Sequence, residues 1–201
     1  MRFLMSLFAL LSWTSLVVAN PVIYQGGRMI DTVVDSNSTD IQWFYSLTSR
    51  QAVGYRHMQF ASAPKPLHLA QVNLLAKRWN KPDSQANIYV MTGIGVQDET
   101  LSPYLGAETD WESRRFYIAG IAEQFWTDTP STKLKLRAGV APYVAELDSL
   151  HTWFILQATQ MSAGEESEQW VLPMIRLFKG NVLTEFGSNG NVHFMSFRVH
   201  F

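Results

Sequence analysis

Apolar and polar side chains alternate along the stretch Lys133-Leu134-Lys135-Leu136-Arg137-Ala138-Gly139-Val140-Ala141-Pro142-Tyr143. Successive side chains of a β-strand point to opposite sides, so Leu134 and Leu136 share one face while Lys135 and Arg137 share the other. An amphipathic helix would repeat its apolar residues every three to four positions instead. The stretch therefore predicts a β-strand that is apolar on one side only.

The same alternation recurs along the chain and predicts an all-β fold of about twelve strands. They are expected at 27–35, 40–47, 52–60, 67–79, 86–96, 107–113, 116–126, 133–143, 150–160, 169–179, 182–188 and 192–201. Ten strands are the alternative if the first segment lies outside the sheet. We find no linker or repeat that divides residues 20–201, so one domain is expected.

The connections fall alternately on two ends of such a sheet. One end is expected to hold 48–51, 80–85, 114–115, 144–149 and 180–181, and the other 36–39, 61–66, 97–106, 127–132, 161–168 and 189–191. The second set is longer on average. An antiparallel up-and-down meander with short turns at one end and longer loops at the other is typical of a transmembrane β-barrel.

The N-terminus has the pattern of a signal peptide. Arg2 precedes an apolar run that ends at Val17-Val18-Ala19, which predicts cleavage after Ala19 and a mature chain from residue 20. A membrane anchor helix is the alternative, although the run is shorter than the ~20 residues that a spanning helix needs. An exported chain without cysteine suits a Gram-negative envelope better than a eukaryotic secretory route.

Composition excludes several classes of function. The 201 residues include 16 basic and 17 acidic side chains and no cysteine. The charge balance argues against nucleic acid as a partner, and the missing cysteines exclude disulfides and thiolate metal sites. The five histidines have no metal-ligand spacing, and Gly93-Ile94-Gly95 is only half of a dinucleotide motif. We therefore expect no metal and no cofactor.

Tight turns predict the register of three hairpins. Arg114-Arg115 sets Trp111 opposite Ile118, and Gly180-Asn181 sets Arg176 opposite Glu185. Asn189-Gly190 is a strong two-residue turn signal. It would set Thr184 opposite Met195.

These registers collect opposed charges on the polar face, where they would line a lumen. The predicted lumen charge cluster comprises Glu108, Asp110, Glu112, Glu123, Lys135, Arg137, Arg176, Glu185 and Arg198. Arg56 and Lys77 are expected on the same face. We interpret the acidic residues as packed lumen carboxylates neutralised by Lys135 and Arg137. The alternative is a general acid and base pair, because like charges close together favour protonation of one carboxylate.

Aromatic residues lie near the ends of the predicted strands, where an interfacial girdle would place them. They are Trp43, Trp79, Trp126, Trp153, Trp170 and Tyr143.

The C-terminal strand, Phe197-Arg198-Val199-His200-Phe201, resembles that of Gram-negative outer-membrane β-barrel proteins. Chains of that family end in a strand with alternating hydrophobic or aromatic residues and a final Phe. The resemblance implies an outer-membrane location with outer-membrane lipids around the barrel. It also implies that the barrel-assembly machinery reads Phe197, Val199 and Phe201.

Three functions remain open at this point. The first is an outer-membrane barrel with a structural or partner-binding role, or one that passes small solutes. The second is an outer-membrane lipid-modifying enzyme, centred on the acidic cluster or on His151 with Asp148 and Thr152 nearby. The third is a soluble periplasmic β-barrel that binds an apolar ligand. The oligomeric state is left open.

Overall fold

The computed structural model describes residues 20–61, 63–146 and 148–201. The predicted signal peptide, residues 1–19, lies outside the described residues. No helix in the described part of the chain is long and apolar enough to cross a membrane. The alternating stretches form antiparallel β-strands, as predicted.

Twelve strands close into one barrel, in which each strand pairs with its neighbours in the chain and β1 pairs with β12. The strands are β1 Arg28–Asp35, β2 Ser38–Thr48, β3 Gln51–Phe60, β4 Leu67–Lys81, β5 Ser84–Gln97, β6 Thr100–Ser113, β7 Phe116–Phe125, β8 Ser131–Val140, β9 His151–Ala163, β10 Glu166–Lys179, β11 Val182–Ser188 and β12 His193–His200. The up-and-down barrel is confirmed. The ten-strand alternative is wrong, because β1 pairs with β2 on one side and with β12 on the other.

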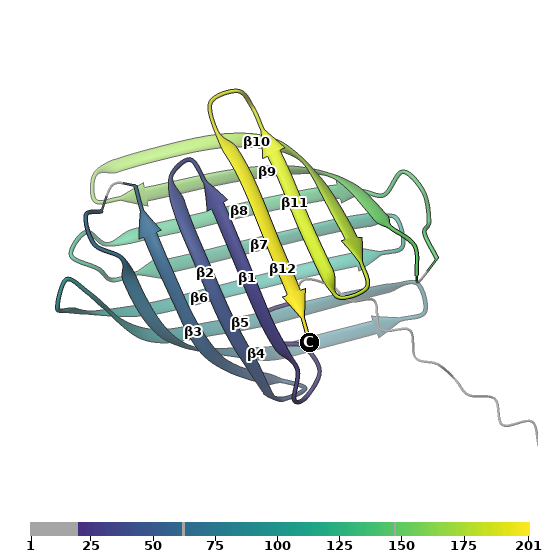
Figure 1. Cartoon of the computed structure of the whole chain (residues 1–201), viewed down its shortest axis with the longest axis horizontal. Coiled ribbons are helices and arrows are strands. Elements are labelled where there is room, and N and C mark those ends of the chain that lie inside the picture. The colour runs from purple at the N-terminus through teal and green to yellow at the C-terminus, as the bar shows by residue number, and fades with distance from the viewer. Residues whose placement is uncertain (1–19, 62, 147) are drawn as a thin grey trace, which may run out of the picture.

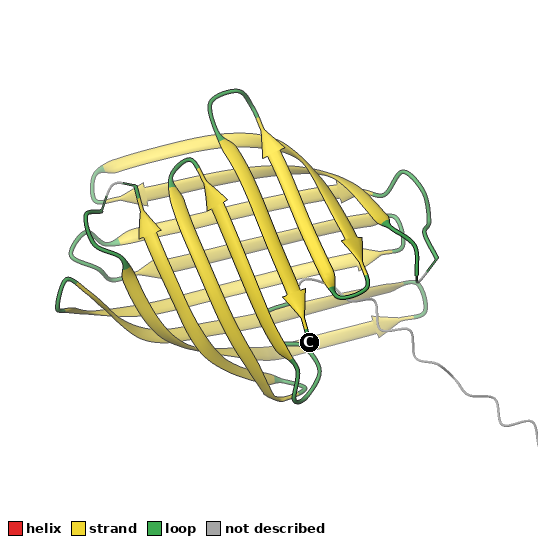
Figure 2. Cartoon of the chain, viewed as in Figure 1, coloured by secondary structure: helices red, strands yellow, loops and turns green. Residues whose placement is uncertain are grey.

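The barrel has a near wall and a far wall whose strands run in different directions. In Figure 1, β1, β2, β11 and β12 run steeply across the near wall, while β5 to β8 cross behind them at a large angle. Figure 2 shows strands joined by loops throughout the described chain. We call the end that holds the start of β1 and the end of β12 the terminal end, and the other the opposite end.

The expected difference in loop length between the two ends is wrong. The longest connection, 141–150, lies at the terminal end, and turns of two residues occur at both ends. At the opposite end β5 and β6 meet at Asp98 and Glu99, whose φ angles are 49° and 69°. Two residues in the left-handed region suit a tight hairpin turn. The strands therefore extend into segments that the sequence predicted as loops.

Two of the three predicted registers are confirmed, those that set Arg176 opposite Glu185 and Trp111 opposite Ile118. The third is wrong by two residues, because Thr184 lies opposite Phe197. Asn189 closes a four-residue loop, since its Oδ1 accepts hydrogen bonds from the N–H groups of residues 191 and 192 at 3.0 and 2.8 Å. A shift of two residues keeps every side chain on its predicted face.

The outer wall is apolar, and each of the twelve strands exposes at least one large apolar side chain on it. On β8, Leu134 and Leu136 are exposed, while the intervening Lys135 lines the interior. Trp43, Trp79, Trp126 and Tyr143 are exposed, as an aromatic girdle requires. A soluble barrel would show the reverse arrangement, with polar side chains outside.

Two predicted girdle residues lie inside the barrel instead. Trp153 is buried, and Trp170 packs against the same apolar cluster as Trp153, together with Ile155 and Leu172. A second cluster near the opposite end contains Phe60, Leu67 and Phe125. Apolar side chains thus fill much of the interior around the polar residues. The position of an aromatic residue near a strand end does not by itself say which face it occupies.

Candidate functional site in the barrel lumen

The structure places all nine residues of the predicted lumen charge cluster in the barrel interior. Asp110, Glu112, Glu123, Arg176 and Glu185 are buried. Glu108, Lys135, Arg137 and Arg198 line the central cavity. The alternation of the sequence is sufficient to assign this face. It does not tell which charges meet.

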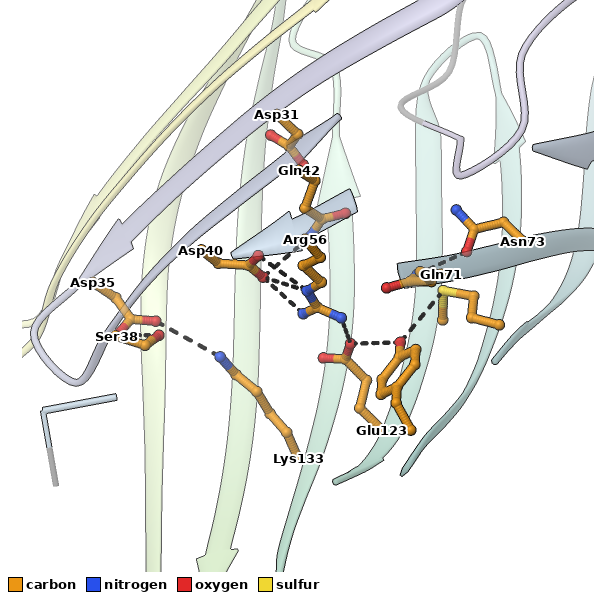
Figure 3. A network of polar contacts seen from close by, with 12 residues as sticks. Asp31, Asp35, Ser38, Asp40, Gln42, Arg56, Gln71, Asn73, Glu123 and Lys133 are labelled. Carbon is orange, nitrogen blue, oxygen red and sulfur yellow. Dashed lines mark hydrogen bonds and ion pairs between the residues drawn. The ribbon is translucent and has the colours of Figure 1, made fainter. Parts of the chain in front are cut away.

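Arg56 on β3 holds two carboxylates (Figure 3). Its Nη2 lies 2.7 Å from Oδ2 of Asp40 on the adjacent β2, and its Nη1 lies 2.7 Å from Oε1 of Glu123 on β7. The Tyr104 hydroxyl donates to the same Glu123 oxygen at 3.0 Å. Because β3 and β7 are not neighbours in the barrel, the contact between Arg56 and Glu123 crosses the lumen.

Glu185 on β11 forms a second centre of charge. Its Oε1 accepts from Nε of Arg176 on β10 at 2.7 Å and from Nη2 of Arg137 on β8 at 2.8 Å. Its Oε2 accepts from the Ser196 hydroxyl on β12 at 3.3 Å. The Arg176 guanidinium also lies 4.5 Å from the ring centre of Tyr117. One carboxylate therefore connects four strands.

Two further ion pairs involve β1, the first strand of the closing seam. Asp31 and Arg198 lie directly opposite each other across β1 and β12 and form a salt bridge. Lys133 on β8 reaches Asp35 with an Nζ to Oδ2 distance of 3.9 Å, as Figure 3 shows. Closure of the barrel thus places both carboxylates of β1 beside a basic side chain.

The predicted neutralisation of the acidic residues differs from the structure. Arg137 pairs with Glu185, and Glu123 pairs with Arg56. Among the described residues, Glu108, Glu112 and Lys135 have no ion pair, and Asp110 accepts a hydrogen bond from Nδ2 of Asn87 at 2.8 Å. The register explains part of this, since Lys135 lies opposite Ile121 and Arg137 opposite Ala119.

The predicted inward position of Lys77 on β4 is wrong. An irregularity between Leu75 and Lys77 shifts the register by one residue. Lys77 consequently lies on the outer wall, 5.8 Å from the ring centre of Trp79. Arg78 lies inside, where its Nε donates to Oδ1 of Asn87 at 2.6 Å. Strict alternation cannot reveal such a bulge.

Three lumen carboxylates, Asp31, Asp35 and Asp40, were not predicted as members of the cluster. Each alternates with residues of the same inward face in its predicted strand, at 27–35 or 40–47, and this parity was a usable signal. The basic partners of Asp31 and Asp35 were not predictable, since they are found only by closing the barrel or by crossing the lumen.

The first described residues enter the barrel at the terminal end. Val22 is buried in an apolar cluster with Met29, Phe44 and Tyr89. Nδ2 of Asn73 donates to the carbonyl of the preceding Pro21 at 3.1 Å. This short segment, residues 20–24, packs into the terminal end of the lumen through Val22, and we call it the N-terminal plug.

Little free space remains between the charged side chains. The central cavity, lined by Asp31, Arg56, Glu123 and Lys135 among others, has a volume of about 100 Å³. This is room for only a few water molecules. The lumen is therefore filled by its own side chains.

Comparison with known proteins identifies the fold. No protein-family model and no curated protein matches the sequence. Among solved structures, the chain is similar to the KdgM porin in complex with disordered oligogalacturonate, with a TM-score of 0.55 and 7% sequence identity, over 87% of this chain and 98% of that one. The chain has the fold of an outer-membrane porin. This confirms the outer-membrane β-barrel fold that the resemblance of the C-terminal strand implied.

Two other porin-fold structures are similar at lower scores. OccK8 (OprE) of Pseudomonas aeruginosa has a TM-score of 0.44 and 8% identity, over 85% of this chain and 62% of that one. OmpTdeltaL8, a loop deletion mutant of OmpT, an outer membrane protein of Vibrio cholerae, has a TM-score of 0.36 and 7% identity, over 87% of this chain and 98% of that one.

Proposed function

We propose that this porin-fold chain is an outer-membrane β-barrel protein whose lumen is sealed by its own ion pairs. It acts as a structural or partner-binding component of the envelope and not as an open pore. The observation that carries the proposal is Arg56, which joins Asp40 to Glu123 across the lumen at 2.7 Å on each side. A solute that passed through the barrel would have to displace this bridge.

The distribution of side chains supports a membrane setting. The barrel is closed, so its strands leave no unpaired edge to face lipid. The outer wall is apolar, and charges gather beyond it at both ends. Exposed basic residues at the terminal end include Arg50, Lys81, Arg114, Arg115 and Lys179, and exposed acidic residues at the opposite end include Asp98, Glu99, Asp128, Glu165 and Glu166.

Passage of solutes has less support than a sealed barrel. The cavity of about 100 Å³ is smaller than the roughly 300–1,000 Å³ of a typical small-molecule pocket. The KdgM porin is described in complex with oligogalacturonate, an acidic chain. In this chain four of the five lumen arginines placed above, Arg56, Arg137, Arg176 and Arg198, are each already paired with a carboxylate, and the fifth, Arg78, donates hydrogen bonds to Asn87 and Tyr89. They are not free to bind an acidic solute.

The acyl-transfer set around His151 has no supporting geometry. His151 packs against the ring of Phe178, with ring centres 5.7 Å apart. The Thr152 hydroxyl instead contacts the Tyr143 hydroxyl at 2.9 Å. Among the described residues, His151 forms no hydrogen bond with Asp148 or Thr152, so an acyl-transfer triad is not assembled. We therefore propose no second function.

Two experiments test the two parts of the proposal. For the location, the mature protein is expected to fractionate with the outer membrane and to migrate differently on gels before and after heating, because a fully paired barrel resists detergent. Recovery as a soluble periplasmic monomer would overturn the membrane part.

For the sealed lumen, the protein is reconstituted in liposomes and swelling is followed in arabinose. The wild type is expected to swell no faster than protein-free liposomes. The double variant Arg56→Ala/Glu123→Ala is expected to swell faster, because the bridge and its side-chain volume are gone. Wild-type swelling at the rate of an open porin would overturn the seal while leaving the location intact.

A further inference from the structure

Two histidines meet on the outer wall. His57 on β3 and His68 on β4 lie directly opposite each other, and their ring centres are 5.0 Å apart with an interplanar angle of 59°. Neither side chain is buried, and His68 is exposed. Their separation in sequence hides this pairing, because the register depends on the connection 61–66.

A tyrosine orients one of the two rings. The Tyr55 hydroxyl lies 2.5 Å from Nδ1 of His68. A histidine that binds a metal usually donates its second ring N–H to an oxygen, which fixes the tautomer and the ring orientation. When Nδ1–H of His68 donates to the phenolic oxygen, Nε2 carries the lone pair and is free to coordinate. The arrangement thus supplies a ligand together with its supporting hydrogen bond.

The spacing of the rings fits a shared ion. Metal–nitrogen bonds to imidazole are about 2.0–2.1 Å, which puts the ion about 3.2 Å from each ring centre. Two rings at a tetrahedral angle around one ion would then have centres about 5 Å apart. The observed distance of 5.0 Å agrees with that geometry.

The pair lies near the opposite end of the barrel. His68 lies opposite Val96, two residues before the exposed turn residue Asp98. The next outward pair beyond His57 consists of Thr39 and Gln59, which are polar. On β2 and β3 the wall therefore becomes polar one pair beyond His57, whereas Val96 beside His68 is still an exposed apolar residue.

We propose that His57 and His68 bind a divalent transition-metal ion on the outer wall, with Tyr55 as the positioning residue. No group of three or more histidine or carboxylate ligands occurs among the described residues. The remaining positions on the ion are therefore filled by water or by a donor from outside the chain. Imidazole ligands suit Cu²⁺, Ni²⁺ and Zn²⁺, and Cu²⁺ is expected to bind most tightly.

The test uses the folded mature protein in detergent, titrated with Cu²⁺ and with Zn²⁺ by calorimetry. Heat-modifiable migration on gels verifies that each variant is folded. One high-affinity ion per chain is expected for each metal, with Cu²⁺ tighter than Zn²⁺. His57→Ala and His68→Ala are each expected to weaken binding at least tenfold, and Tyr55→Phe to weaken it by a smaller factor. The control variants His151→Ala and His193→Ala are expected to bind as the wild type does.

Electron paramagnetic resonance of the Cu²⁺ complex adds a structural readout. Coupling to two imidazole nitrogens is expected in the wild type and to one in His57→Ala. Undiminished binding by the folded double variant His57→Ala/His68→Ala would overturn the proposal, as would the absence of binding by the wild type. The result is independent of whether the lumen is sealed.

Discussion

Arg176 and Glu185 lie directly opposite each other on β10 and β11, and their Nε and Oε1 atoms are 2.7 Å apart. The same Glu185 oxygen also accepts from Arg137 on β8 at 2.8 Å. Glu185 therefore serves two cations, whereas Arg176 has only this carboxylate as an ion-pair partner in the described chain. The two partners of the pair are not equivalent, and their removal has different consequences.

Glu185→Ala is expected to lower the free energy of unfolding by about 3–5 kcal/mol, because it leaves the buried Arg176 and the half-buried Arg137 without their carboxylate. Arg176→Ala is expected to cost less, about 1–3 kcal/mol, since Arg137 still neutralises Glu185. The double variant should cost clearly less than the sum of the two. Urea unfolding of the barrel in lipid vesicles measures all three. Glu166→Ala, at an exposed rim position, is the control and should change stability little. Strictly additive losses would show that the two side chains do not interact.

The N-terminal plug provides a second prediction. Val22 is 2% exposed, whereas Tyr24, two residues later, is 59% exposed. Val22→Ala is expected to lower the free energy of unfolding by about 1–2 kcal/mol, because buried methyl groups are lost from the cluster with Met29 and Phe44. Tyr24→Ala is the matched control and should have little effect. Equal losses for the two variants in urea unfolding would contradict the inserted plug.

The third prediction concerns the end of the chain. The backbone groups of Phe201 and Arg28 exchange two hydrogen bonds, at 2.7 and 3.0 Å, while the Phe201 side chain is exposed. Deletion of Phe201 is expected to leave export intact and to lower the amount of folded barrel in the membrane. Phe201→Asp retains the backbone bonds and isolates the side chain, which the resemblance implies is read during assembly.

Phe201→Tyr serves as the aromatic control for this experiment. Gels run with and without heating, together with fractionation, give the folded amount of each variant. If Phe201→Asp assembles as well as Phe201→Tyr, the assembly role carried over from outer-membrane barrels does not apply to this side chain.

The sequence predicted the number of strands and their two faces because both follow from the local alternation of apolar and polar residues. Lys133 to Val140 alternate strictly, and the structure retains that alternation over the whole of β8. The predicted register of the last hairpin was wrong by two residues. Because a shift by an even number keeps each side chain on its face, Phe197 still lies on the outer wall as predicted. Local alternation therefore determined most of the architecture.

The contacts of the lumen could not be predicted in the same way. Arg56 and Glu123 belong to strands that are not neighbours, so their contact depends on how close the closed barrel brings its two opposite walls. Lys77 lies on the outer wall and not in the lumen because of an irregularity in β4 that no turn residue marks in the sequence. His57 and His68 were overlooked because their opposition depends on a six-residue connection. In each case a long-range or irregular feature decides the contact.

Oxygen accessibility of spin labels along β8 tests the assignment of wall and lumen most directly. The chain has no cysteine, so single cysteines can be placed at residues 134 to 138 and labelled in the protein reconstituted in vesicles. Positions 134, 136 and 138 are expected to show high accessibility to oxygen, which concentrates in lipid. Positions 135 and 137 should be poorly accessible both to oxygen and to a water-soluble nickel chelate, because the lumen is sealed. High nickel accessibility at 135 and 137 would contradict the seal, and oxygen maxima at those positions would contradict the assignment of the faces.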